Sequence, residues 1–315
     1  MIKKESNTIN IDHLYGMGLP ALRSYIEAME NNLSLLEERN FNVRSNAIDA
    51  LEFQIIDQNE ELLQKEYHPE KLVSLQLRAE KLKSRLEEID INLFERLRTE
   101  IREGKHRGED FNNLINEYCD LDQVSDSHAG EPYYDNLDIF INGLISLAQI
   151  PRSTNDLEPG MVYYQKTPAR IIFELVKKLH FTTEDVFFDL GSGLGQPCIL
   201  VNLLAGIESH GVEFDPAFCR YANECARRLG LSKVNFINAD ARVASYSNGT
   251  IFFMFTSFRD EMLNAVLEIL KNESLRRKIR IITYGPCTAE ITSLKWLKSI
   301  SGNNSDYDLS VFTSF

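Results

Sequence analysis

The amino-acid sequence predicts a two-part protein, with an all-helical N-terminal domain over residues 1–150 and an α/β domain over residues 151–315. In the first part, apolar residues recur three and four positions apart, which is typical of packed helices. The second part alternates short, continuous apolar runs with amphipathic segments, which predicts a parallel sheet covered by helices on both faces. The polar stretch Pro151–Gly160 marks the expected boundary between the two.

Three apolar runs between residues 20 and 93 predict long helices that pack as a bundle or an antiparallel coiled coil. Pro69 suits the first turn of the third helix and Gly104 suits its end. Shorter helices are expected around Phe111–Tyr118 and Leu137–Leu147. We interpret this part as an accessory domain, and the alternative is a device for forming a homodimer through these helices. The third run is the most regular, with Leu72, Leu75, Ala79, Leu82, Leu86, Ile89 and Leu93.

The α/β part is expected to start with a helix that has Thr167 as its N-cap and Pro168 in its first turn. Further helices are expected after the glycine-rich segment to about residue 205, over 216–229 and 260–270, and near 291–297. Ligands of such a sheet bind at the carboxyl ends of its strands. The expected strands are Val186–Leu190, a run ending at Glu213, Val234–Ile237, Thr250–Phe255, Ile279–Tyr284 and Leu309–Phe315.

Composition and charge narrow the classes of function. The five cysteines lack Cys-x-x-Cys spacing and the six histidines lack ligand spacing, so neither a disulfide framework nor a metal site is expected. No apolar run approaches the roughly 20 residues of a membrane-spanning helix, and no secretory signal is apparent, so we expect a cytoplasmic protein. Residues 1–160 carry 17 Lys and Arg against 31 Asp and Glu, and this acidity disfavours nucleic acid as a partner.

A glycine-rich loop follows the first expected strand and reads Asp189-Leu-Gly191-Ser192-Gly193-Leu-Gly195-Gln196. Glycines allow a tight turn that brings a ligand against backbone N–H groups at a helix N-terminus. Asp189 would repel a pyrophosphate, so a ligand with an amino-acid head group fits better. Glu213 and Asp240 end the next two strands, where a carboxylate can accept hydrogen bonds from ribose hydroxyls or an adenine amino group.

This order of motifs resembles the class I S-adenosylmethionine methyltransferases, whose first motif ends in Asp-x-Gly-x-Gly-x-Gly. The resemblance covers about residues 161–315 and implies a Rossmann-like sheet, S-adenosylmethionine as cofactor and methyl transfer as the reaction. It also implies that the glycine loop contacts the methionine portion, Glu213 the ribose and Asp240 the adenine. The cofactor-binding residues expected on this basis are Asp189, Gly191, Ser192, Gly193, Gly195, Gln196, Glu213, Phe214, Asp240, Ala241, Phe255 and Thr256.

The segment Asp189–Gln196 is also similar to the first motif of the histone lysine methyltransferases named for disruption of telomeric silencing. Those enzymes carry a tyrosine- and threonine-containing segment before the helix that leads into the first strand, as Tyr163-Tyr-Gln-Lys-Thr167 does here. Their asparagine-rich segment after the fourth strand is missing, since this chain has Phe255-Thr-Ser-Phe258 there. The similarity suggests kinship, with a protein lysine as one acceptor class.

The acceptor pocket is expected between the loop before the first strand and the ends of the fourth and fifth strands. Methyl transfer from a sulfonium is an in-line displacement, so alignment accounts for much of the catalysis. Aromatic walls suit a cationic head group, so we expect an amine acceptor on a basic protein or a small molecule. Tyr284 or an ordered water is the candidate base. The candidate catalytic residues are Tyr163, Tyr164, Thr256, Arg259 and Tyr284.

Several features leave alternatives open. The stretch from Glu109 to Ile150 has nine acids and no Lys or Arg, which fits either a solvated linker and helix surface or a docking surface for a basic substrate. A basic patch, Arg276-Arg-Lys278 with Arg280, could instead dock RNA. An NAD-dependent oxidoreductase would require Gly-x-Gly-x-x-Gly and leaves Asp240 without a role. A non-catalytic protein that senses the cofactor and acts through its helices would share these sequence features.

Overall fold

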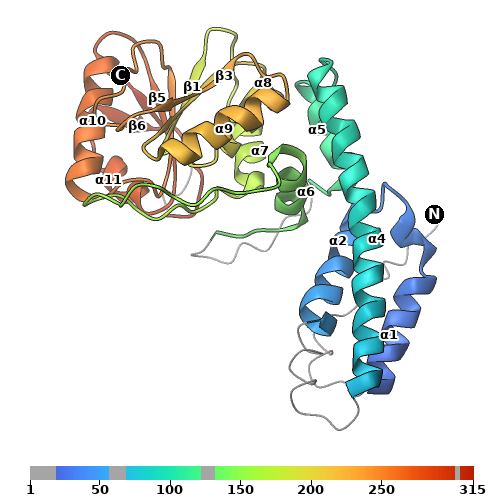
Figure 1. Ribbon diagram of the computed structural model, residues 1–315. Helices are drawn as coiled ribbons and strands as arrows, with labels where there is room; N and C mark the ends of the chain where they lie inside the picture. Colours follow the sequence, from blue (N-terminus) through green and yellow to red (C-terminus); the bar gives the residue numbers. More distant parts are fainter. Residues whose placement is uncertain (1–18, 57–68, 122–131, 302–305) are drawn as a thin grey trace. The chain divides into compact units, whose positions relative to one another are not determined.

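A computed structural model of the chain describes residues 19–56, 69–121, 132–301 and 306–315 (Figure 1). The described residues form two compact units, one up to Glu95 and one from Arg96 onward, and the domain boundary expected at residues 151–160 stays a prediction. Helices α5 (Glu109–Tyr118) and α6 (Asn136–Ile145) belong to the second unit, because they pack against helices of the α/β part. The ring of Phe111 in α5 stacks on that of Phe173 in the α/β unit, with centroids 6.5 Å apart.

The first unit is helical, as the apolar spacing predicted. It contains α1 (Leu19–Asn31), η2 (Leu33–Leu36), α2 (Phe41–Asp49) and η3 (Ala50–Ile56), together with most of α4 (Pro69–Arg102). Helix α4 begins at the expected proline. The second of the three expected runs consists of Ile48, Leu51, Ile55 and Leu62, and Leu62 lies outside the described residues. The core of this unit is made by residues of the predicted runs, among them Leu22, Ile26, Leu51, Leu75, Leu82 and Leu86.

The second unit contains a seven-stranded sheet in the order β3-β2-β1-β4-β5-β7-β6. Neighbouring strands from β3 to β5 are parallel, and β7 is antiparallel to both β5 and β6. The strand order reverses between β1 and β4, which creates the switch point where ligands of such sheets bind. The predicted Rossmann-like α/β fold is confirmed. The strands are β1 (Val186–Leu190), β2 (Glu208–Glu213), β3 (Val234–Asn238), β4 (Ile251–Phe255), β5 (Arg280–Tyr284), β6 (Leu297–Ser299) and β7 (Ser310–Ser314).

Helices cover both faces of this sheet. Figure 1 shows α8 (Gln196–Ala205) and α9 (Pro216–Arg228) on one side, and α10 (Asp260–Ser274) and α11 (Cys287–Thr292) on the other. Helix α7 (Ala169–Lys178) packs on α8 and has Pro168, not Thr167, as its N-cap. The helix expected near residues 291–297 is wrong, because α11 starts directly after β5 and Leu297 pairs with Ser314 in the sheet.

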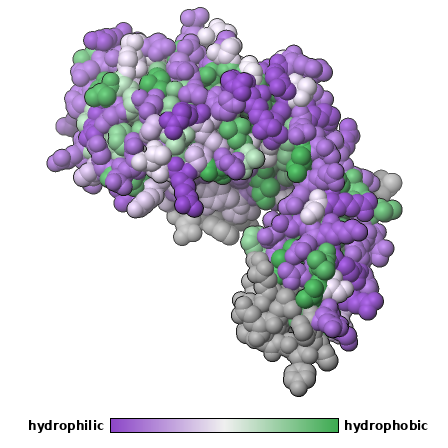
Figure 2. Space-filling view, in the orientation of Figure 1, coloured by the Kyte–Doolittle hydropathy of each residue, from purple (hydrophilic) through white to green (hydrophobic). Residues whose placement is uncertain are grey.

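Hydrophilic residues cover most of the visible surface, with scattered hydrophobic ones (Figure 2). No helix in the described part of the chain is long and apolar enough to cross a membrane. The five cysteines are buried thiols.

We predict from the packing of α5 and α6 that residues 96–315 unfold as one cooperative unit. A chain that starts at residue 151 lacks the partners of α7 and α8 and leaves the ring of Phe173 without its stacking partner Phe111. Its Tm should be lower by about 10 °C or more, since each kcal/mol shifts Tm by roughly 2–4 °C in a domain of this size. Thermal unfolding followed by circular dichroism compares the chain that starts at residue 151 with one that starts at residue 96. Equal Tm values would support a boundary near residue 150 instead.

Candidate functional site

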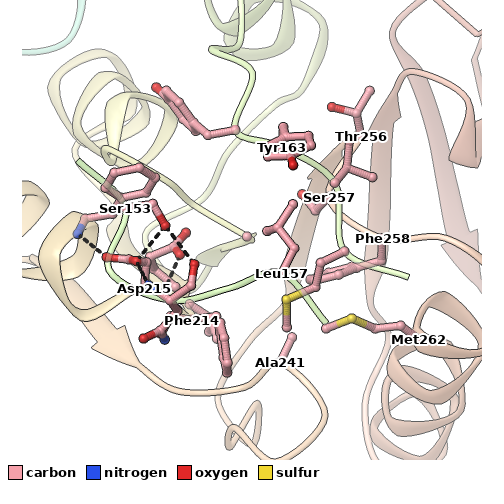
Figure 3. Close-up of a pocket in the computed structure, with 18 of the residues that line it drawn as sticks. Ser153, Leu157, Tyr163, Phe214, Asp215, Ala241, Thr256, Ser257, Phe258 and Met262 are labelled. Atoms are coloured by element: carbon pink, nitrogen blue, oxygen red, sulfur yellow. Dashed lines mark hydrogen bonds between the residues drawn. The ribbon is translucent and has the colours of Figure 1, made fainter. Parts of the chain in front are cut away.

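A cavity of about 420 Å³ lies at the carboxyl ends of β1, β2 and β4, where the strand order reverses (Figure 3). Small-molecule sites have volumes of roughly 300–1,000 Å³, so the cavity has the size of a ligand site. Figure 3 shows Phe214 and Asp215 on one side, Thr256, Ser257 and Phe258 on the other, and Leu157 between them. The cavity therefore lies where the sheet topology predicts a ligand.

The glycine loop after β1 forms the floor of this region and depends on glycine. Gly191 and Gly193 have φ values of 80° and 51°, in the left-handed region that side chains disfavour. A Cβ added to Gly193 would overlap the ring of Tyr164, and one added to Gly191 would lie 2.7 Å from the Ser257 side chain. The loop thus fits between the two walls only because it has no side chains at these positions.

Glu213 ends β2 and places its buried carboxylate in the cavity, with 9% of the residue exposed. One oxygen, Oε2, accepts a hydrogen bond from the backbone N–H of Gly193, and the other, Oε1, accepts from that of Asp215, each at 2.7 Å. Burial raises the pKa of this carboxyl, and the backbone N–H groups oppose the rise. Each oxygen has a second lone pair, so the carboxylate can accept further hydrogen bonds from a ligand's hydroxyls.

A smaller cavity of about 20 Å³ lies beside the first and shares Tyr164, Gln165, Gly191 and Phe255 with it. This volume holds about one group the size of a water molecule. Its walls include Asp189, Ser192 and Gln196. Ser192 Oγ and Gln196 Oε1 are buried there, with no hydrogen-bond partner among the described residues.

Asp189 is fully buried in this smaller cavity. Its desolvation, together with the charge of Glu213, raises its pKa to about 8. Buried acceptors without donors are unfavourable, and a buried carboxylate requires a cationic partner. A ligand ammonium group would supply both the charge and the missing donors. Asp189, Ser192 and Gln196 therefore fit the amino-acid head group that the sequence predicted.

Asp240 follows β3, and its side chain is held by a basic partner. Arg242 donates from Nε at 3.0 Å and from its backbone N–H at 2.8 Å to Asp240 Oδ1. These contacts lower the pKa of the Asp240 carboxyl. The residues that line the cavity at this point are the neighbouring Ala239 and Ala241, with Val212 and Phe214, so an aromatic base would meet an apolar surface there.

The polar stretch at which the sequence predicts the domain boundary forms a wall of the cavity, together with the residues that follow it. We call residues 153–165 the strap. The cavity is lined by these residues of the strap: Ser153, Asn155, Asp156, Leu157 and residues 161–165. Gly160 C=O accepts a hydrogen bond from Arg259 N–H at 2.8 Å, and Met161 forms an isolated bridge with Phe258. Except for Tyr163, Tyr164 and Gln165, sequence reasoning missed these residues, because a polar, glycine-containing stretch looks like a connection.

The candidate catalytic residues fall into two groups. Tyr163, Tyr164 and Thr256 line the cavity, and Tyr163 is 84% exposed. Arg259 is exposed at the N-cap of α10 and Tyr284 is buried in the sheet, and neither is among the lining residues that the structure describes. Burial raises the pKa of Tyr284 to about 12, so its hydroxyl keeps its proton at neutral pH and does not suit the role of base.

Comparison with known proteins agrees with the sequence motifs. Residues 160–231, which contain the glycine loop and Glu213, match the family model described as histone methylation protein DOT1. A solved RNA methyltransferase from Salinibacter ruber, in complex with S-adenosyl-L-homocysteine, is 19% identical and has a TM-score of 0.38. That match covers 48% of this chain and 92% of the other.

A second solved structure is a SAM-dependent methyltransferase from Geobacter sulfurreducens, also in complex with S-adenosyl-L-homocysteine. It is 24% identical with a TM-score of 0.31, and the match covers 36% of this chain and 47% of that one. The family-model match and the order of the motifs together show an S-adenosylmethionine-dependent methyltransferase, similar over residues 160–231 to the histone methylation protein DOT1.

Proposed function

We propose that the methyl acceptor is an amine, carried by a basic protein or by a small molecule. The charge of the cavity lining is the observation that carries this proposal. The described residues of the lining include three acids, Asp156, Glu213 and Asp215, and no Lys, Arg or His. A site for a nucleic acid needs cations that neutralise phosphates, whereas an acidic lining attracts a cationic acceptor.

Aromatic rings at the cavity support the same acceptor class. Tyr163, Tyr164, Phe255 and Phe258 line it. Behind Phe255 lies Tyr284, with ring centroids 5.3 Å apart, and Tyr307 follows at 5.7 Å. The faces of aromatic rings attract an ammonium group once water is excluded. The acceptor's alkyl chain would also gain from contact with these apolar surfaces.

The residues of this chain have separable tasks in the proposed reaction. When bound, S-adenosylmethionine would supply a sulfonium methyl group that the lone pair of a neutral amine attacks, so that the new N–C bond forms as the S–C bond breaks and S-adenosylhomocysteine leaves. The ammonium proton of the acceptor passes to solvent before the attack. Asp189, Ser192 and Gln196 would hold the methionine head group and Glu213 the ribose. Tyr164, which lies against Gly193, would limit the access of water. Holding the acceptor in line with the bond that breaks is the main contribution left to the protein.

The acidic stretch before the strap has a partly structural role. Asp135 pairs with Arg170 at 2.7 Å and caps α6, and Asp138 is buried and accepts from the backbone N–H of Ala169 at 2.8 Å. These two acids stabilise the contact between α6 and α7. Docking of a basic substrate along this stretch would therefore depend on the acids that remain.

A transfer assay with tritiated methyl groups tests the acceptor class. Core histones, poly-lysine and spermidine are compared with total RNA and DNA at moderate salt, and the chain carrying Glu213→Ala serves as the control with impaired cofactor binding. We expect label in the basic proteins or the polyamine, in material sensitive to protease or small enough to dialyse. Label found only in nucleic acid, and retained after protease treatment, would contradict the proposal and favour RNA or DNA as acceptor.

A further inference from the structure

We propose that Asp215 is a positioning residue that fastens the strap over the bound cofactor and thereby sets how slowly the cofactor dissociates. The inference concerns cofactor retention and does not depend on the identity of the acceptor. It rests on the S-adenosylmethionine site described above. The two oxygens of the buried Asp215 carboxylate accept hydrogen bonds from different segments, one from the strap and the other mainly from the first turn of α9 (Figure 3).

The Oδ2 atom of Asp215 holds the start of the strap. It accepts hydrogen bonds from Ser153 Oγ at 2.9 Å, from the backbone N–H of Thr154 at 2.5 Å and from that of Asn155 at 2.9 Å. The hydroxyl of Thr154 is 3.2 Å from both carboxylate oxygens. Three consecutive residues of an otherwise irregular segment thus converge on one acceptor.

The Oδ1 atom of Asp215 has a different task, because it caps α9. It accepts from the backbone N–H groups of Ala217 at 2.8 Å and Phe218 at 3.2 Å. Burial by itself would raise the pKa of Asp215, but the hydrogen bonds from Asn155, Thr154, Ser153 and the helix keep it well below its usual range. The group is therefore ionised at every physiological pH, and its hydrogen bonds are of the stronger, charge-assisted kind.

The fastening point lies two residues from the predicted ribose ligand. The backbone N–H of Asp215 donates to Glu213 Oε1 at 2.7 Å, and the side-chain amide of Asn155 donates to the carbonyl of Phe214 at 3.1 Å. Strap residues Leu157, Tyr163 and Tyr164 line the same cavity as Glu213. A cofactor bound by Glu213 would therefore lie against the strap, and its departure would be easier when the strap is loose.

Two further contacts hold the later part of the strap. Glu158 pairs with Arg242 at 2.5 Å, and Gly160 C=O accepts from Arg259 N–H. Loss of the Asp215 contact should accordingly free residues 153–155 without releasing the whole strap. This makes the role of Asp215 separable from the general stability of the wall.

The substitution Asp215→Asn separates the two tasks of the carboxylate. Asparagine is as good an N-cap as aspartate, so one oxygen can still cap α9, while an amide NH₂ faces the donors of the strap. We expect the dissociation rate of S-adenosylhomocysteine to rise about tenfold, as for the loss of a charge-assisted contact, with a matching rise in Kd. Hydrogen exchange should accelerate at the amides of Thr154 and Asn155.

A matched control is Asp185→Asn, which changes a similarly hydrogen-bonded acid away from the cavity lining. Asp185 accepts from the backbone N–H of Thr182 at 2.8 Å and from Arg280 at 2.7 Å, next to the start of β1. This variant should lose stability while its dissociation rate for S-adenosylhomocysteine stays unchanged. If Asp215→Asn does not fold, the pair Ser153→Ala and Thr154→Val removes only the hydroxyl donors and should give a smaller increase in the same rate.

The outcomes distinguish this inference from the cofactor assignment on which it rests. Wild-type chain that binds S-adenosylhomocysteine, together with an Asp215→Asn chain that releases it at the wild-type rate, would overturn the inference and leave the methyltransferase assignment intact. An equal increase in the Asp185→Asn chain would also overturn it, because general loosening would then explain the effect. Wild-type chain that does not bind S-adenosylhomocysteine at all would contradict both.

Discussion

Replacing Glu213 with alanine should weaken the binding of S-adenosylmethionine and S-adenosylhomocysteine by at least about tenfold, because hydrogen bonds to a charged acceptor contribute roughly 1.5–3 kcal/mol. The structure adds a second reason for a large effect. The same carboxylate accepts a hydrogen bond from the backbone N–H of Gly193 at 2.7 Å, so its removal also leaves this N–H of the glycine loop without its acceptor. Isothermal titration calorimetry with each ligand measures the change.

Two further variants test whether the loss of affinity comes from the Glu213 carboxylate itself. Glu213→Gln keeps the shape and one acceptor oxygen, so it should weaken binding less than alanine does. Glu208→Gln lies at the start of the same strand, where Glu208 is exposed and contacts His210, and should leave the affinity unchanged. Unaltered affinity of the Glu213→Ala chain would show that this acid organises the loop and does not bind the ribose.

The substitution Asp189→Asn should have opposite effects on stability and on cofactor binding. Because burial raises the pKa of Asp189 to about 8, the folded state holds a proton that the unfolded state releases near pH 4. This carboxyl therefore lowers the stability of the free protein progressively as the pH rises from about 4 to 8. Asparagine does not ionise, so the variant should have the higher Tm at pH 8–9 in the absence of ligand.

Binding should respond in the other direction. A ligand ammonium requires the ionised carboxylate, so wild-type chain should release a proton on binding S-adenosylhomocysteine at pH 6–7, and its affinity should rise by up to about tenfold per pH unit in that range. The Asp189→Asn chain should bind more than about tenfold more weakly and without this pH dependence. Calorimetry in buffers of different ionisation enthalpy counts the released proton. If the affinity of wild-type chain did not vary with pH, this would contradict a direct contact between Asp189 and the ligand amine.

The strands and the order of the motifs could be predicted because their signals are local. A buried parallel strand is a continuous apolar run, so the runs at Val186–Leu190 and Val234–Ile237 lie within one residue of β1 and β3. Glycines and acids that follow such runs necessarily lie at one edge of the sheet. Glu213 and the glycine loop could be brought together on this basis alone, and the structure joins them by a hydrogen bond.

The strap and the division of the chain depend on contacts between distant residues. Nothing in the composition of residues 153–155 indicates that Asp215, some sixty positions later, accepts their hydrogen bonds. The division at residue 95 likewise depends on α5 and α6 presenting apolar faces to α7 and α8, whereas a change in local composition occurs only near residue 150. Local patterns predict elements well, but they do not show which elements pack together.

Thr256, at the carboxyl end of β4, has φ = 48°, a conformation that a β-branched residue adopts at a cost of about 1–3 kcal/mol. The surrounding structure therefore holds the backbone here against its own preference. Gly285 packs closely against this residue, since a Cβ added there would lie 2.8 Å from Thr256 Cγ2. This wall of the cavity therefore contains backbone strain. A rearrangement that returned Thr256 to an ordinary φ would release this strain and would move the neighbouring lining residues Ser257 and Phe258. Binding of an acceptor against this wall could therefore be coupled to a favourable change of backbone conformation.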